Sequence, residues 1–166
     1  MMKLFKTLLF LLILLISGQL SIFGQNNDNK NEFERDNILA PIVTLFDSMR
    51  AQDTTLLRST FIENPYLATI SGPVENLSYR DASTLDDFVN SIGNHSGSQL
   101  DERINTENII IQSDGMMATA WVPYQFYVGD TFSHCGVNVF IMMKDEAGNW
   151  KTTSITDTRR KESCEI

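Results

Sequence analysis

The strongest constraint on the fold is a series of β-strand patterns that fills Leu100–Arg160. Hydrophobic runs alternate there with short segments of turn residues, and each of these segments contains a glycine. Runs joined by short glycine-bearing loops are typical of β-hairpins. The pattern predicts four consecutive antiparallel strands, over Leu100–Gln112, Met116–Val128, Thr131–Met143 and Trp150–Arg160.

Helical patterns precede these strands. Apolar residues recur with helical period from Ile38 to Met49, and Pro41 fits only the first turn of such a helix. A short second helix is predicted to begin at Asp53-Thr54, and a third covers Leu85–Ile92. The predicted fold class is therefore α+β, with three N-terminal helices packed on a curved, mainly antiparallel sheet.

Composition limits the partners of the chain. With 166 residues, of which 42% are apolar, the chain is long enough to form the core of a single domain. Its net charge of −8 opposes binding to nucleic acid, whose affinity depends on Lys and Arg that neutralise phosphates. The same charge opposes binding to an anionic membrane surface.

The N-terminus has the pattern of a secretory signal peptide. A basic start is followed by the apolar run Leu8–Ile16 and by small residues up to Gly24. The alternative is an uncleaved anchor, but this run is shorter than the roughly 20 residues that span a membrane. We expect an exported protein, periplasmic or extracellular, that is not membrane-bound after cleavage. The expected organisation is a signal peptide (1–24), a disordered lead-in (25–35), a domain (36–160) and a C-terminal tail (161–166).

The order of elements from Asp36 to Arg160 resembles the NTF2-like superfamily, a cone-shaped α+β fold that includes scytalone dehydratase, ketosteroid isomerase and the SnoaL-like proteins. The segment Gly148-Asn149-Trp150-Lys151 is similar to the start of that family's closing strand. The segment Thr156–Arg160 resembles the ending of secreted bacterial members, some of which are described as lumazine-binding. The resemblance implies a pocket between the first helix and the sheet, and homodimerisation through the sheet. It implies no activity, because this fold hosts enzymes and non-enzymes, and the catalytic patterns of the enzymes do not match.

Turn geometry predicts which side chains share a face of the sheet. A two-residue turn at Gly129-Asp130 places Val128 opposite Thr131. Counting from there pairs Tyr124 with Cys135 on an aliphatic face that the helices would cover. The other face then combines polar and aromatic residues, with the pairs Gln125–His134, Trp121–Asn138 and Thr119–Phe140.

The last hairpin is predicted to turn at Glu146-Ala147-Gly148, which pairs Asp145 with Asn149. Asp157 then lies beside Val137, and Arg159 lies beside Cys135, on the helix-covered face. A slip by one residue would move both to the face of His134.

Two clusters are candidates for chemistry. Asp157 near Tyr124, with Arg159 close by, would form the polar end of a pocket, where desolvation raises a carboxyl pKa and suits a general base. The alternative is a structural ion pair at the mouth of the sheet. His134, with Gln125 and Asn138, is a possible proton shuttle, since imidazole titrates near neutrality. The alternative there is a half-exposed strand histidine at a dimer interface.

Other site types lack their motifs. The chain has two His and two Cys with no C-x-x-C, so neither a metal site nor a cofactor is predicted. The sequence has no glycine-rich phosphate loop and no G-x-S-x-G elbow. Cys135 and Cys164 form either a disulfide that closes the tail or a buried thiol and a free one.

Three functions follow from these patterns. The first is non-catalytic binding of a small apolar or aromatic molecule in the cone pocket. The second is a dehydratase or isomerase-type enzyme that uses Asp157 or His134 for proton transfer. The third is a dimeric interaction module whose pocket is filled by side chains. The predicted ligand-binding residues are Tyr124, Asp157, Arg159, Trp121, Asn138 and Phe46.

Overall fold

A computed structural model describes residues 32–80 and 84–164. The chain divides into two compact units, residues 1–36 and Asn37–Ile166, and the account below concerns the second. The predicted signal peptide lies outside the described residues. Residues 32–35, which the sequence assigned to a disordered lead-in, are helical. Within the described ranges, no helix combines the length and the apolar character needed to cross a membrane.

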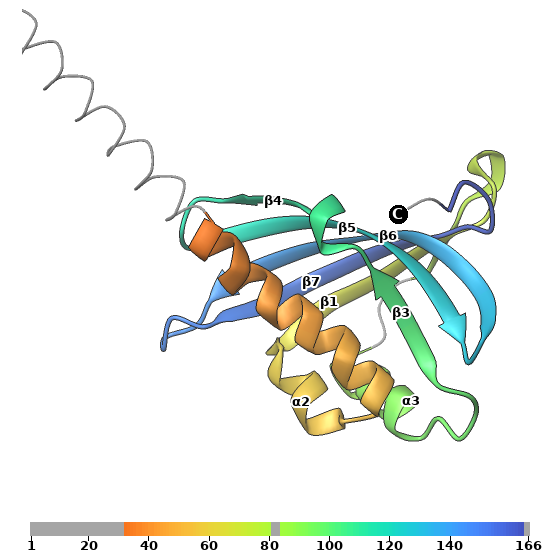
Figure 1. The fold of residues 1–166 in the computed structure, drawn as a ribbon, viewed down its shortest axis with the longest axis horizontal. Coiled ribbons are helices and arrows are strands. Elements are labelled where there is room, and N and C mark those ends of the chain that lie inside the picture. Colours follow the sequence, from red (N-terminus) through yellow and green to blue (C-terminus); the bar gives the residue numbers. More distant parts are fainter. Residues whose placement is uncertain (1–31, 81–83, 165–166) are drawn as a thin grey trace, which may run out of the picture. The chain divides into compact units, whose positions relative to one another are not determined.

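The strands of the described part form one sheet of seven, in the order β2-β1-β7-β6-β5-β3, with β4 pairing with β5 off this path (Figure 1). The pairing is antiparallel except between β1 and β7, which run parallel. Three of the four predicted strands are confirmed, and they are β5, β6 and β7. The bounds are β1 (Phe61–Ser71), β2 (Ser78–Arg80), β3 (Leu100–Ile104), β4 (Ile110–Ser113), β5 (Met117–Val128), β6 (Thr131–Lys144) and β7 (Trp150–Arg159).

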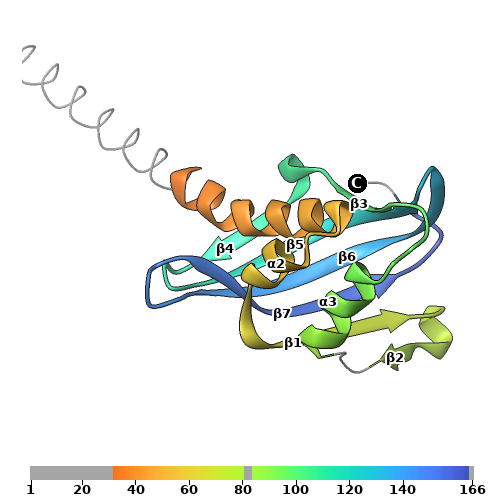
Figure 2. The same cartoon turned by 90° about the horizontal axis from the view of Figure 1, so that it is seen from below.

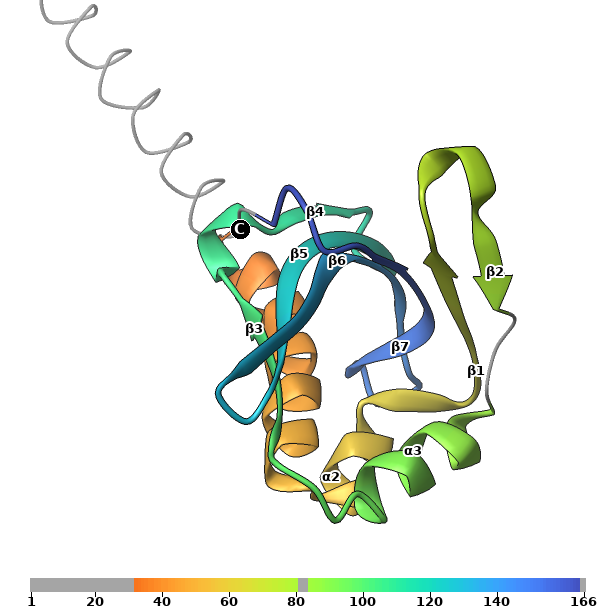
Figure 3. The ribbon, with the colours of Figure 1, turned by 90° about the vertical axis from the view of Figure 1, so that its right-hand side faces the viewer.

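The helices lie on one face of this sheet, which curves around them (Figures 2 and 3). They are a helix over residues 32–51, α2 (Thr54–Ser59) and α3 (Leu85–Gly93). Each short helix has the N-cap that the sequence predicts: the Asp53 side chain accepts a hydrogen bond from the Leu56 amide, and Thr84 forms a capping box with Asp87. The predicted α+β class, with helices covering a mainly antiparallel sheet, is therefore confirmed.

The first helix begins earlier than Pro41 predicts. Because the helix already includes residue 32, Pro41 lies in its interior, where it removes one backbone hydrogen bond. The apolar stripe compensates for this loss, since Ile38, Ile42 and Leu45 are almost completely buried in the core. Packing of this stripe on the sheet therefore outweighs the local preference of proline.

The predicted strand over Leu100–Gln112 is wrong in one respect, because it is two strands. A short 3-10 helix, η2 (Thr106–Asn108), separates β3 from β4, and the Asn105 side chain accepts a hydrogen bond from the Glu107 amide at its start. Both strands pair with β5, β3 along its second half and β4 along its first. An asparagine cap thus divides the predicted strand into two without changing its partner strand.

A β-bulge shifts the register between β5 and β6. Val128 lies opposite Thr131 as predicted, but Tyr127 pairs with Phe132 and Phe126 with His134, so Ser133 is an extra residue. Beyond the bulge every predicted pair is displaced by one. The observed pairs are Gln125–Cys135, Tyr124–Gly136, Val122–Asn138, Trp121–Val139 and Thr119–Ile141.

A second bulge follows between β6 and β7. Ile141 pairs with Ser154 and Met142 with Thr152, so Thr153 is the extra residue. The Asp145–Asn149 turn is as predicted, but the partner of Asp157 is Asn138 rather than Val137. Likewise, Cys135 lies opposite Arg160 rather than Arg159.

Candidate functional site

A cavity of about 490 Å³ lies between the helices and the inner face of the sheet. Its walls include apolar side chains from the first helix, α3 and the strands β1, β5 and β7, and its polar residues come mainly from β1, β3, β6 and β7. The apolar lining residues are Leu45, Phe46, Met49, Leu67, Ala68, Phe88, Ile92, Phe126 and Ile155. The polar lining residues include Thr69, Glu102, Tyr124, His134, Asn138, Asp157 and Arg159.

The two register shifts bring both predicted clusters into this one cavity. Relative to the prediction, the first bulge moves His134 and Asn138 to the inner face of the sheet. The second bulge compensates for the first, so Asp157 and Arg159 stay on the inner face that was predicted for them. Side chains that the sequence assigned to opposite faces are therefore neighbours.

Asp157 is the centre of the polar end. Its Oδ1 accepts a hydrogen bond from Thr69 Oγ1 at 2.6 Å, and its Oδ2 accepts one from Arg159 Nε at 2.8 Å. The Arg159 guanidinium also donates to Thr69 Oγ1 at 3.3 Å. These three side chains form a closed network in which Arg159 balances the carboxylate charge, so the structure contains the Asp157–Arg159 ion pair that the sequence left open as the alternative.

Tyr124 lies beside this network with its phenol buried. Its hydroxyl donates to the Thr158 carbonyl at 2.9 Å and lies 3.3 Å from Asp157 Oδ2. Gly136 leaves room for the Tyr124 ring and the Thr158 carbonyl, because a Cβ on residue 136 would lie 1.7 Å from the Thr158 oxygen and 2.9 Å from the Tyr124 ring. Burial, and then the charges of Glu102 and Asp157, raise the phenol pKa, so Tyr124 remains protonated.

Glu102 on β3 is the functional residue that the sequence analysis missed. Its side chain is only 9% exposed, and its Oε1 accepts a hydrogen bond from Asn138 Nδ2 at 2.6 Å. Burial raises the pKa of Glu102 to about 7, and Asp157 adds to this effect, whereas the Asn138 hydrogen bond and Arg159 oppose it. Close to neutral pH this carboxyl is therefore divided between its protonated and ionised forms.

The alternation of side chains along β3 could have predicted that Glu102 is buried. Leu100, Glu102 and Ile104 share one side of β3 because side chains alternate along a strand, and both apolar neighbours pack against the core. A carboxyl between two core-facing residues must be buried. The flanking Asp101 and Arg103 concealed this pattern, since the three charged residues together suggest an exposed segment.

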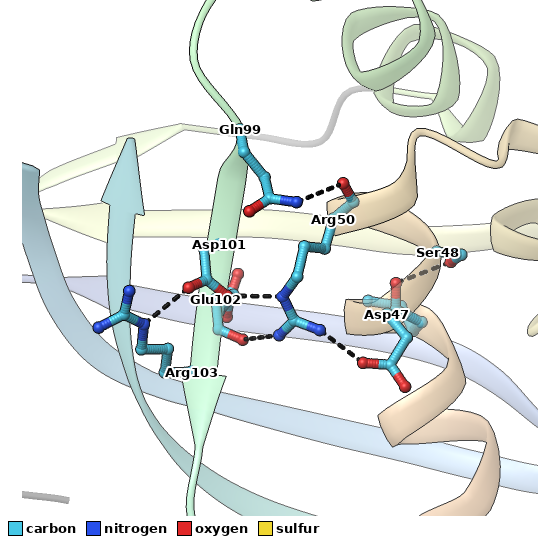
Figure 4. Close-up of polar contacts among 8 residues, drawn as sticks. Asp47, Ser48, Arg50, Gln99, Asp101, Glu102 and Arg103 are labelled. Carbon is cyan, nitrogen blue, oxygen red and sulfur yellow. Dashed lines mark hydrogen bonds and ion pairs between the residues drawn. The ribbon is translucent and has the colours of Figure 1, made fainter. Parts of the chain in front are cut away.

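A network around Arg50 fixes the position of β3 against the first helix (Figure 4). Arg50 Nε lies 2.7 Å from Asp101 Oδ1, and Arg50 Nη1 lies 2.6 Å from Asp47 Oδ1. Asp101 also pairs with Arg103 at 2.7 Å, and Gln99 Nε2 donates to the Arg50 carbonyl at 3.3 Å. The strand that carries Glu102 is thereby tied to the helix that forms the facing wall of the cavity.

His134 contributes an aromatic edge to the cavity. Its ring packs against Tyr124 and Phe126, with centroid distances of 5.8 Å and 5.0 Å, and its Nδ1 lies 3.0 Å from Ser133 Oγ. Burial, and then the charge of Arg159, lower the pKa of His134. The imidazole is therefore neutral at neutral pH.

The remaining predicted site residues divide between the two faces. Phe46 and Asn138 line the cavity, but Trp121 does not, because it lies on the outer face of the sheet and is 50% exposed. Gln125, predicted to be near His134, also lies on the outer face, where its Nε2 donates to the Cys164 carbonyl at 2.6 Å. The bulge at Ser133 explains both differences, because it leaves Trp121 and Gln125 on the outer face and moves their predicted neighbours Asn138 and His134 to the inner face.

The C-terminal tail is held against the outer face by a disulfide between Cys135 and Cys164, whose Cα atoms are 5.5 Å apart. The Arg160 side chain also donates to the Ser163 carbonyl. Among residues 32–80 and 84–164, no group of three or more His, Cys, Asp or Glu side chains is placed to hold a metal ion.

Solved structures share this architecture. An NTF2-like protein of unknown function from Shewanella baltica is 18% identical with a TM-score of 0.56, over 78% of this chain and 95% of that one. An NTF2-like protein with a cystatin-like fold from Novosphingobium aromaticivorans is 14% identical with a TM-score of 0.63, over 83% and 89%. A protein from the same organism, provisionally named as a scytalone dehydratase, is 14% identical with a TM-score of 0.64, over 84% and 92%.

No protein-family model matches the sequence, and no curated protein matches it. At these identities the structural likeness establishes the fold alone, and that fold is NTF2-like.

Proposed function

We propose that this NTF2-like domain binds a small, largely apolar molecule whose polar end lies against Asp157, Tyr124 and Glu102. The observation that carries the proposal is the cavity of about 490 Å³, with an apolar wall opposite a polar one. Cavities of about 300–1,000 Å³ with mainly apolar walls and a few convergent polar groups are typical of small-molecule sites. A dimeric interaction module whose pocket is filled by side chains, in contrast, would have no such cavity.

Filling the cavity tests this proposal. In I155W, an indole replaces a lining side chain of β7, whereas the matched variant I141W places the same indole on the outer face of β6, where Ile141 is 40% exposed. Native mass spectrometry or a thermal-shift screen of small aromatic compounds should find ligands for the wild type and I141W. I155W should bind none of them. Equal binding by I155W would disprove a site in the cavity.

A second candidate is a dehydratase or isomerase-type enzyme. The observation that favours it is the convergence of Asp157, Glu102, Tyr124 and His134 on one cavity. Asp157 or His134 would then transfer a proton at a carbon next to a carbonyl. NMR of β-hydroxyketones in D₂O with the wild type should show elimination or exchange that D157N and H134Q lack. The same slow background rate for all three proteins would exclude this candidate.

We also propose that two copies associate through the outer face of the sheet. Support comes from an apolar outer-face patch that consists of Ile110, Met117, Trp121, Ile141 and Met143, each at least 40% exposed. Contiguous apolar patches of this kind often mark protein interfaces. W121E should convert a dimer to a monomer in analytical ultracentrifugation. A wild-type monomer at all concentrations would refute the proposal.

Export is proposed on two grounds. The N-terminal sequence has the pattern of a signal peptide, and disulfides such as Cys135–Cys164 persist in oxidising compartments. When the full sequence is expressed in a bacterial host, the protein should appear in the periplasm or medium with its new N-terminus near Gly24. A cytoplasmic protein with an intact N-terminus would contradict this.

A further inference from the structure

The two carboxyl oxygens of Glu102 differ in their hydrogen bonding. Oε1 accepts the hydrogen bond from Asn138, whereas Oε2 makes no hydrogen bond within the part of the chain that the structure describes. Because Oε1 is already an acceptor, the proton of the neutral carboxyl resides on Oε2. Glu102 lines the cavity, so this O–H is a donor available to a bound molecule.

The two charged groups that act on Glu102 compensate each other. Asp157 is paired with Arg159 at 2.8 Å, and His134 is neutral at neutral pH. A ligand carboxylate placed at Glu102 would therefore find Arg159 already engaged, and would also face two carboxyl groups. A neutral ligand with an acceptor oxygen needs no cation and is not repelled by the carboxyl groups. Its oxygen also accepts the hydrogen bond that Glu102 donates.

We infer that the ligand of this cavity is a neutral carbonyl compound that accepts its hydrogen bond from the protonated carboxyl of Glu102, so that binding is linked to proton uptake. This inference rests on the proposed function and specifies its ligand class. The ligand has an apolar body against the helix-facing wall and a ketone, aldehyde or amide oxygen at Glu102. Ionisation of Glu102 removes the donor and places a charge beside the carbonyl oxygen.

Other groups that face Glu102 do not produce the same pH dependence. From β5, Tyr124 remains protonated, and from β7, Asp157 and Arg159 form an ion pair. From β6, burial and then the charge of Arg159 lower the pKa of His134, which favours its neutral form. From the first helix, Arg50 is paired with Asp47 and Asp101 and remains cationic.

The test uses a matched pair of fluorescent probes. The ketone 6-propionyl-2-(dimethylamino)naphthalene shifts its emission to the red when its carbonyl accepts a hydrogen bond, and 2-(dimethylamino)naphthalene lacks only the propionyl group. If the protonated form alone binds, the apparent dissociation constant of the ketone should rise about tenfold between pH 6 and pH 8, in proportion to the lost competent fraction. The affinity of the probe without the carbonyl should stay constant.

The variant E102Q keeps a donor that does not titrate. It should bind the ketone equally at both pH values, whereas E107Q, which removes an exposed carboxylate outside the cavity, should behave like the wild type. H134Q should show the same rise in the ketone dissociation constant between pH 6 and pH 8 as the wild type, even if it binds the ketone more weakly or more tightly. If E102Q does not fold, calorimetry of the wild type in buffers of different ionisation enthalpy gives a second measure. It should report about one proton taken up per ketone at pH 8.

The outcomes separate the inference from the function on which it rests. If neither probe binds, the proposed function fails, and the inference fails with it. If both probes bind with affinities that do not depend on pH, the cavity binds ligands but Glu102 is not the donor. Ketone affinity that rises with pH would also overturn the inference, since it would require an ionised Glu102.

Discussion

Asn138 Nδ2 donates to Glu102 Oε1 at 2.6 Å, and this hydrogen bond joins two strands that are not neighbours. Asn138 belongs to β6 and Glu102 to β3, and β5 lies between them in the sheet. The sheet is curved (Figure 3), and we attribute the contact between the two side chains on its inner face to this curvature. The pKa of Glu102 therefore depends on a hydrogen bond that requires this curvature of the sheet.

The first prediction concerns pH and stability. The folded-state pKa of Glu102, about 7, lies above its ordinary value of 4.5, so folding favours the protonated form. The wild type should therefore lose stability as pH rises through this interval, by up to about 3 kcal/mol. Urea unfolding should show that the stability of E102Q relative to the wild type increases from pH 5 to pH 8. A constant difference between the two proteins would contradict the raised pKa.

The second prediction concerns Gly136. G136A places a methyl group against the Thr158 carbonyl and the Tyr124 ring, and both must move to accommodate it. We expect a loss of about 3 kcal/mol or more, at the upper end of overpacking effects. Chemical denaturation measures this loss as a change in the free energy of unfolding. G97A is a useful control, because the nearest atoms there belong to the half-buried His95 ring, at 3.0 Å and 3.1 Å, and a small shift of this ring costs at most its hydrogen bond to the Ser98 carbonyl. Similar losses in both variants would contradict the prediction.

The third prediction compares two ion pairs. R50A removes the link between the first helix and Asp101, whose side chain is 14% exposed, and should reduce stability by about 1–2 kcal/mol. R58A breaks the pair with Asp86, whose side chain is 74% exposed, and should leave stability nearly unchanged. Thermal unfolding of both variants tests the difference. An R58A loss equal to that of R50A would show that burial is not what distinguishes them.

The fourth prediction concerns the disulfide. Cys135 and Cys164 are separated by 29 residues, and closing a loop of this length stabilises a fold by about 3–4 kcal/mol in the chain-entropy model. The double variant C135S/C164S should unfold at a correspondingly lower urea concentration. Because the disulfide lies on the outer face, ligands found for the wild type should still bind below that concentration. Loss of binding without unfolding would show that the tail affects the cavity.

Turns and caps could be predicted from the sequence, whereas strand registers, and with them the faces of β6, could not. Asp53 and Thr84 cap helices through local chemistry, and Gly129-Asp130 determines its own turn. The bulges at Ser133 and Thr153 have no such signature, because they depend on how a twisted sheet bends around its core. Each bulge displaces all later pairs by one residue, and one residue exchanges the two faces of a strand.

The site shows the same division between local and long-range information. Asp157 and Arg159 lie on the predicted face only because the second bulge compensates for the first. Glu102 was accessible through alternation along β3, but its partner Asn138 was not, since their contact crosses β5. Local pattern therefore predicted turns, caps and alternation along a strand, and long-range geometry determined which side chains meet.

The parallel ladder between β1 and β7 has a consequence for the order in which the domain is built. Thr69 and Asp157, which share a hydrogen bond in the cavity, are 88 positions apart, and the partner strand of β1 is the last strand of the sheet. A chain emerging from the ribosome cannot complete this ladder until β7 has been translated. Until then the nascent chain lacks the closed cavity, because β1 has no β7 to pair with.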